Sequence, residues 1–73
     1  MQTVKILAID LRPTIEELYK MGEARIVDQI IAQLTRHVDD YVPETVIEIS
    51  LSDEDAAQVE DAMVELEYFS DFI

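Results

Sequence analysis

The last third of the sequence concentrates acidic side chains. From Ser50 to Ile73 the chain carries eight Asp or Glu residues and no Lys or Arg. Carboxylates that lie close together repel one another, so the chemistry open to such a segment is the binding of something positive. That positive group is either a cation or a basic protein surface.

The net charge of −12 arises entirely in the second half of the 73-residue chain. Residues 1–36 contain five acidic and five basic residues, whereas residues 37–73 contain twelve acidic residues and no Lys or Arg. A field of this sign repels nucleic acid and anionic membranes, so we expect neither as a direct partner. It favours a basic, nucleic-acid-binding protein as the partner.

A helix is predicted to carry most of these acids. Ser52 is its expected N-cap, and Asp53, Glu54 and Asp55 fall in the first turn, where carboxylates favour the helix dipole. The helix should run to about Tyr68 or beyond. The stripe expected to face the core is Ala56, Val59, Ala62, Met63, Leu66 and Phe69. The predicted partner-binding residues are Glu54, Glu60, Asp61, Val64, Glu65, Glu67, Tyr68 and Asp71.

Apolar residues lie among these outward acids, because Ala57, Val64 and Tyr68 recur at helical spacing. Acidic neighbours such as Asp61 and Glu65 cost a few tenths of a kcal/mol per pair, and no nearby base offsets them. Carboxylates repeated along a rigid helix can imitate the phosphate row of DNA. The pattern therefore favours a DNA mimic, although an acidic face can also serve solubility alone.

No set of residues predicts catalysis or cofactor binding. The chain has no Cys, one His (His37) and one Gly (Gly22), so it lacks a Cys/His pair, a Ser/His/Asp set and a phosphate-binding glycine loop. The acidic run at Asp53 lacks the Gly and terminal Glu of a calcium loop, and helix capping explains it better. We expect no enzyme activity, no metal and no cofactor.

Length and hydrophobicity indicate one domain, residues 1–73, of a soluble cytoplasmic protein. A hydrophobic content of 49% argues against disorder. The apolar runs are far shorter than the ~18 residues of a membrane span. The N-terminal stretch lacks the basic region and long apolar core of a signal peptide.

The first half predicts a strand and a kinked helix. Residues 3–11 are apolar on both faces, so we expect a strand covered on both sides. Pro13 should end it, and a capping box of Thr14 and Glu17 should begin the helix. The apolar stripes before and after Gly22 are offset by roughly a third of a turn, which predicts a kink or break there. The helix should then continue to about Asp40.

The predicted fold class is α+β, in the order strand, kinked helix, strand, helix, with a two-stranded sheet. The second strand is residues 45–51, with Ile47, Ile49 and Leu51 facing the core. The sequence leaves parallel and antiparallel pairing open. Two strands alone are marginally stable, so we expect a homodimer, through strand edges or through the helix at Val27–Val38.

The stretch from Ala32 to Ile49 resembles the DNA-damage-inducible protein I family of bacterial recombinase modulators. Leu34, Thr35, Arg36, Val38 and Pro43 match a family pattern in which a helix, a proline and an alternating strand follow one another. The chain end also resembles the family's acidic terminal helix, through Ser70, Asp71 and Phe72. The resemblance implies a small α+β fold whose acidic C-terminal helix engages a DNA-binding recombinase.

Two classes of function follow from these patterns. In the first, the protein inhibits or modulates a bacterial DNA-binding protein, such as a recombinase, nucleoid protein, polymerase or nuclease, and is of bacterial or phage origin. In the second, it is an oligomerisation or adaptor module, for instance an antitoxin that neutralises a basic toxin.

Overall fold

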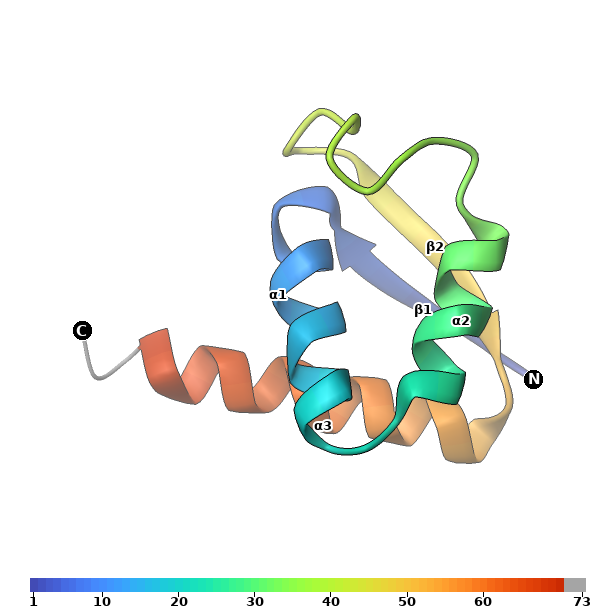
Figure 1. Ribbon diagram of the computed structural model, residues 1–73, viewed down its shortest axis with the longest axis vertical. Helices are drawn as coiled ribbons and strands as arrows, with labels where there is room; N and C mark the ends of the chain where they lie inside the picture. Colours follow the sequence, from blue (N-terminus) through green and yellow to red (C-terminus); the bar gives the residue numbers. More distant parts are fainter. Residues whose placement is uncertain (71–73) are drawn as a thin grey trace.

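The computed structural model describes the backbone of residues 1–70 and the side chains of residues 1–66 (Figure 1). The elements in chain order are β1 (Gln2–Leu7), α1 (Ala8–Lys20), α2 (Ala24–Gln33), β2 (Val46–Leu51) and α3 (Asp53–Ser70). The strands form a two-stranded antiparallel sheet, so the expected α+β class is confirmed and the pairing direction is decided.

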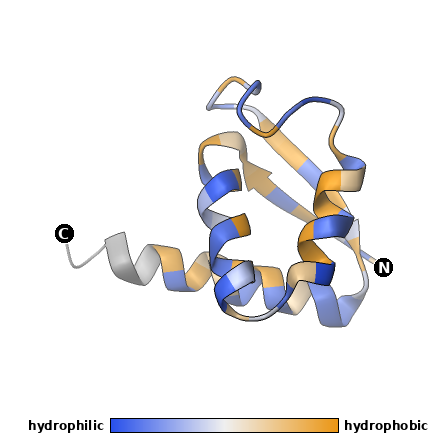
Figure 2. Ribbon diagram, in the orientation of Figure 1, coloured by the Kyte–Doolittle hydropathy of each residue, from blue (hydrophilic) through white to orange (hydrophobic). Residues whose placement is uncertain are grey.

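The sheet buries one face only. Buried and exposed residues alternate along both strands. The side chains that enter the core are Val4, Ile6, Ile47, Ile49 and Leu51. The open face carries the cross-strand pairs Leu7–Val46, Lys5–Glu48 and Thr3–Ser50. Successive side chains of a strand point to opposite faces, so the buried side chains of both strands lie on one face of the sheet. The three helices of residues 1–70 all cover that face. Figure 2 shows hydrophobic and hydrophilic residues alternating along these helices, as expected when each buries one side.

The prediction of a first strand covered on both sides is wrong. The strand ends at Leu7, which lies on the open face and is 44% exposed. The apolar residues that follow belong to α1, where Leu11 is buried and Ile9 is 63% exposed. The apolar run of residues 3–11 is divided between β1 and α1, but its composition is that of a strand buried on both faces. This is why the sequence alone suggests one long strand.

The start of α1 is also earlier than predicted, because the chain caps this helix with backbone rather than side chain. The N–H groups of Ala8 and Ile9 donate to the carbonyls of Thr45 (2.8 Å) and Pro43 (3.2 Å) in the loop before β2. Pro13 lies inside the helix instead of ending a strand. Thr14, expected at the N-cap, is fully buried in the helix interior, and its hydroxyl has no hydrogen-bond partner among the described residues.

The break at Gly22 is confirmed. Gly22 has φ +78°, a left-handed backbone conformation that residues other than glycine adopt at an energetic cost. Its N–H donates to the carbonyl of Tyr19 at 3.1 Å, and the N–H of Glu23 donates to the carbonyl of Leu18 at 2.9 Å. These two bonds form a Schellman motif, which ends α1 and turns the chain into α2.

The helix after Gly22 is shorter than predicted, since α2 ends at Gln33 and residues 34–45 form a loop. The Gln33 side chain accepts from the Ser50 N–H and donates to the Ser50 carbonyl, both at 2.8 Å. The Tyr41 hydroxyl then accepts the N–H groups of Thr35 (3.0 Å) and Arg36 (3.3 Å). The apolar residues of this segment have helical spacing, but they pack against the core from a folded loop.

Replacing Thr14 by Val should stabilise the protein. A buried hydroxyl without a partner costs roughly 1–3 kcal/mol, and valine keeps the shape and the β-branch of threonine. We expect the free energy of unfolding in urea to rise by about 1 kcal/mol, and the Tm by about 4–8 °C. Thr35→Val is the control, since Thr35 is exposed and should show no gain. A loss of stability in Thr14→Val would show that the hydroxyl has a partner after all.

Candidate protein-binding surface

One side of α3 is acidic and exposed. Of the predicted partner-binding residues, the structure places Glu54, Glu60, Asp61, Val64 and Glu65 on this exposed side. We call these five residues, together with exposed Ala57, the acidic face. The opposite side of the helix carries Ala56, Val59 and Ala62, which are fully buried as the predicted stripe requires. Met63 and Leu66 of that stripe are half-buried.

Three predicted partner-binding residues lie outside the described side chains, namely Glu67, Tyr68 and Asp71. The same holds for Phe69 of the predicted core stripe.

The acidic face has an apolar centre between carboxylates. Ala57, Asp61 and Val64 follow one another at spacings of four and three residues, so neighbours stand ~5–6 Å apart at the Cβ atoms. At 100° per residue, Glu65 lies on one side of this line and Glu60 on the other. Val64 is 61% exposed, which leaves an apolar contact point surrounded by negative charge.

The carboxylates of the acidic face have no basic partner within residues 1–66. The ion pairs of this part of the chain join Arg12 to Asp39 and Arg25 to Asp55, and His37 lies near Asp39. α3 itself has no basic residue in its last turn. The charge of the acidic face is therefore directed at solvent and at whatever binds there.

Among the described side chains of α3, Asp55 is the acid that points inward. Its side chain is 7% exposed and accepts from Arg25 Nη2 (3.1 Å), Arg25 Nη1 (3.5 Å) and Gln29 Nε2 (3.2 Å). Burial by itself raises the pKa of Asp55 and is the largest influence, but the bonds from Arg25, Gln29 and Ser52 together lower the pKa below its ordinary value. Asp55 is thus an ionised group that fastens α3 to α2, on the same side of α3 as its buried apolar residues.

The capping role predicted for this first turn is confirmed in part. The Ser52 hydroxyl accepts the Asp55 N–H at 3.2 Å, as an N-cap does. The inward bonds of the Asp55 side chain were not predicted. A signal for them was present, because Asp55 is four residues before Val59 and seven before Ala62, on the buried side of the helix.

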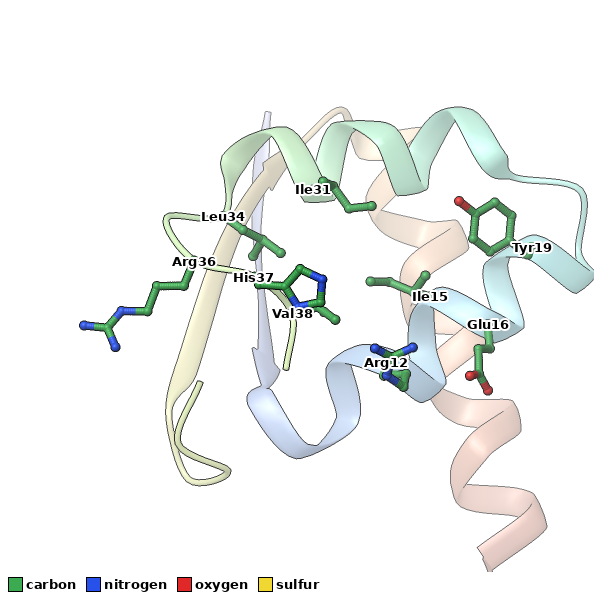
Figure 3. Close-up of a pocket in the computed structure, with 9 residues that line it drawn as sticks. All are labelled: Arg12, Ile15, Glu16, Tyr19, Ile31, Leu34, Arg36, His37 and Val38. Atoms are coloured by element: carbon green, nitrogen blue, oxygen red, sulfur yellow. The ribbon is translucent and has the colours of Figure 1, made fainter. Parts of the chain in front are cut away.

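A groove that the sequence did not predict lies between α1 and α2. It has a volume of about 360 Å³ and is lined by Arg12, Ile15, Glu16, Tyr19, Ile31, Leu34, Arg36, His37 and Val38 (Figure 3). Ile15 and Ile31 point into it from the two helices. The loop forms its far wall and is tied to α1 by the Arg12 side chain, which donates to both oxygens of Asp39.

The groove contains one imidazole, on His37, which accepts the Asp39 N–H through Nδ1 at 3.3 Å. The described residues that line the groove include no serine or cysteine. The bond from Arg12 lowers the pKa of Asp39 below its ordinary value, so that carboxylate is held as an anion. Within residues 1–66, no three His, Asp or Glu side chains gather in a way that could hold a metal ion.

Comparison with family models, curated proteins and solved structures finds no match to this chain. No helix in the described part of the chain is long and apolar enough to cross a membrane.

The Arg25–Asp55 contact should make stability depend on pH in a defined window. The pKa of Asp55 is lowered on folding, so its ionised carboxylate contributes to the free energy of unfolding. This contribution is fully present above the pKa of the unfolded chain, about 4, and is lost as pH falls through the pKa of the folded protein. We expect Asp55→Asn to lower the Tm at pH 7, and the difference from the original protein to shrink below about pH 4.

The matched control is Asp53→Asn, which removes an exposed acid from the same turn. Thermal unfolding followed by circular dichroism between pH 7 and pH 2 measures both. A Tm difference for Asp55→Asn that stayed constant to pH 2 would contradict the role of the ionised carboxylate.

Proposed function

We propose that this protein is a non-enzymatic regulator that binds a basic, nucleic-acid-binding protein of the bacterial cytoplasm through the acidic face of α3. The observation that carries the proposal is the sorting of charge on this helix. Among its side chains up to residue 66, the buried carboxylate of Asp55 is bonded to Arg25 and Gln29, whereas the carboxylates of the acidic face are exposed and have no ion-pair partner.

The spacing of these charges supports a DNA mimic. Glu54, Glu60, Asp61 and Glu65 lie along a helix rise of roughly 16 Å, or about one charge per 5.5 Å. A single strand of B-DNA carries one charge per ~3.4 Å of axis. The acidic face is sparser than DNA and its charges are unevenly spaced, but they have the same sign and lie along one helix. Val64 adds an apolar contact that nonspecific phosphate binding does not use.

The resemblance to the DNA-damage-inducible protein I family supports a recombinase as the first target to test. In that family the acidic C-terminal helix is the part that engages the recombinase, and α3 occupies the same place in this chain. Nucleoid proteins, polymerases and nucleases bind the same phosphate array, so they are the next targets. With a net charge of −12, the protein itself should bind neither DNA nor an anionic membrane.

Charge reversal on the acidic face tests the proposal. We expect the protein to displace fluorescent DNA from a bacterial recombinase, or from another member of a panel of DNA-binding proteins, with a potency that falls as salt rises. Asp61→Lys combined with Glu65→Lys should weaken displacement by about a hundredfold or more, because like charges then face each other. The Tm should stay the same or rise, because the two introduced lysines repel each other about as much as the two acids did, while the net charge of the chain becomes less negative.

The control is Asp40→Lys combined with Glu44→Lys, which changes the net charge equally at exposed positions of the loop. Equal weakening by both double variants would mean that net charge alone acts, and would contradict a specific acidic face. Unfolding of the Asp61/Glu65 variant would mean that these acids are structural.

A salt-dependent pull-down from bacterial lysate separates the proposed class from the alternative. A DNA mimic should retain nucleic-acid-binding proteins, and nuclease-resistant DNA added to the lysate should compete them off. Retention of one small basic protein that DNA does not displace would support an antitoxin-like or adaptor module instead.

A further inference from the structure

The groove between α1 and α2 is apolar at its centre and open to solvent. Ile15 and Ile31 point toward each other across it, and Leu34 and Val38 close it from the loop (Figure 3). Ile31 is 50% exposed and Tyr19 is 54% exposed, so these side chains are half covered by the fold itself. A volume of about 360 Å³ is at the lower end of the ~300–1,000 Å³ range of ligand pockets.

The rim of the groove is the part of this acidic protein where basic groups gather. Two of the five Lys and Arg residues and the single His line it, with one acid, Glu16. Arg12 is neutralised by Asp39, but the Arg36 guanidinium has no ion-pair partner within residues 1–66 and points outward at one end of the groove. An occupant with apolar side chains and carboxylates would complement both the centre and the rim.

We infer that this groove binds residues 67–73 of a second copy of the chain. That segment contains Tyr68, Phe69, Phe72 and Ile73, with two acids, Glu67 and Asp71, and no base. Its aromatic side chains match the apolar centre, and its carboxylates match Arg36 and His37. The inference is independent of the proposed function, since it concerns how copies of the protein meet.

The occupant comes from another copy because α3 leads away from the groove of its own molecule. α3 crosses beneath α2 and α1 and extends beyond α1 on the side opposite α2, whereas the groove lies between these two helices (Figure 1). Two copies related by a twofold axis can exchange these ends, so that each groove receives the segment of its partner.

The sheet edges are poorer routes to a dimer. On β2, the Gln33 side chain already occupies the N–H and carbonyl of Ser50. Along β1, residues that bond to β2 alternate with residues whose N–H and carbonyl groups point away from β2. Because Ala8 donates to Thr45, the residues that point away from β2 are Thr3, Lys5 and Leu7. If two β1 edges paired symmetrically and antiparallel through the free backbone groups of these three residues, Lys5 would lie opposite Lys5 of the second copy. Like charges directly opposite destabilise such a pairing, and edge lysines commonly prevent it.

A −12 chain also repels its own copies, and the basic groups that line the groove reduce this repulsion there. At the groove, α3 of one copy would meet Arg36, His37 and an apolar surface.

Sedimentation velocity on the full chain and its variants tests the inference. We expect the original protein to form a species of twice 8.4 kDa at micromolar to sub-millimolar concentration. Ile31→Glu in the groove and Phe72→Ser in the segment should each raise the dissociation constant by about tenfold or more. Tyr19→Glu is a second groove variant at an exposed position, in case Ile31→Glu disturbs α2.

Ile9→Glu is the matched control. It makes the same substitution at a more exposed isoleucine of α1 outside the groove, so the dimer should persist. Mixing Ile31→Glu with Phe72→Ser should give a heterodimer that is tighter than the dimer of either variant but weaker than the original dimer, because only one of its two contacts joins an intact segment to an intact groove. Circular dichroism confirms that each variant is folded.

The inference is overturned if the original protein sediments only at 8.4 kDa, which would leave the groove to its own chain or to another protein. It is equally overturned if the groove variants leave the dimer intact, or if the mixture of the two defective variants associates no more tightly than either variant alone.

Discussion

A two-stranded sheet can bury its hydrophobic side chains only if other elements cover one of its faces, and this constraint organises the whole molecule. Two strands alone are marginal in water. Here the core side chains of β1 and β2 all point to one face, and α1, α2 and α3 pack against that face together. Three helices that share so small a sheet must also contact one another, so the contacts between helices are as important as their contacts with the strands.

The contact between α2 and α3 has the largest consequence for the surface. Asp55 enters the core side of α3 and accepts hydrogen bonds from Arg25 and Gln29 of α2. This contact and the buried side chains of Ala56, Val59 and Ala62 lie on the same side of α3. Together they turn Glu60, Asp61 and Glu65 toward solvent.

The loop between α2 and β2 performs the corresponding task on the other side of the molecule. Its carbonyls cap the start of α1, and Asp39 ties it to Arg12. These contacts hold Leu34 and Val38 beside α1 and so create the groove. Residues 67, 68 and 71 belong to the inferred occupant of the groove, and the sequence also predicts them to bind the partner protein. On these two proposals, self-association and target binding would compete for the end of the chain.

Local signals in the sequence determined the parts of this fold that depend on neighbouring residues. Gly22 marked the end of a helix because a left-handed residue is required there, Ser52 marked the start of α3, and the alternation from Val46 to Leu51 marked β2. The exposed acids of α3 were predicted for the same reason, since helical spacing separates its two sides.

Tertiary structure alone decided where α1 begins and where α2 ends. The caps of α1 are carbonyls of residues 43 and 45, and Gln33 at the end of α2 bonds to Ser50, far away in the sequence. The inward turn of Asp55 and the groove likewise depend on groups that the fold brings together from distant positions. Periodicity reports which side of an element is apolar, but it contains no information about which distant polar group will satisfy a backbone end or a buried charge.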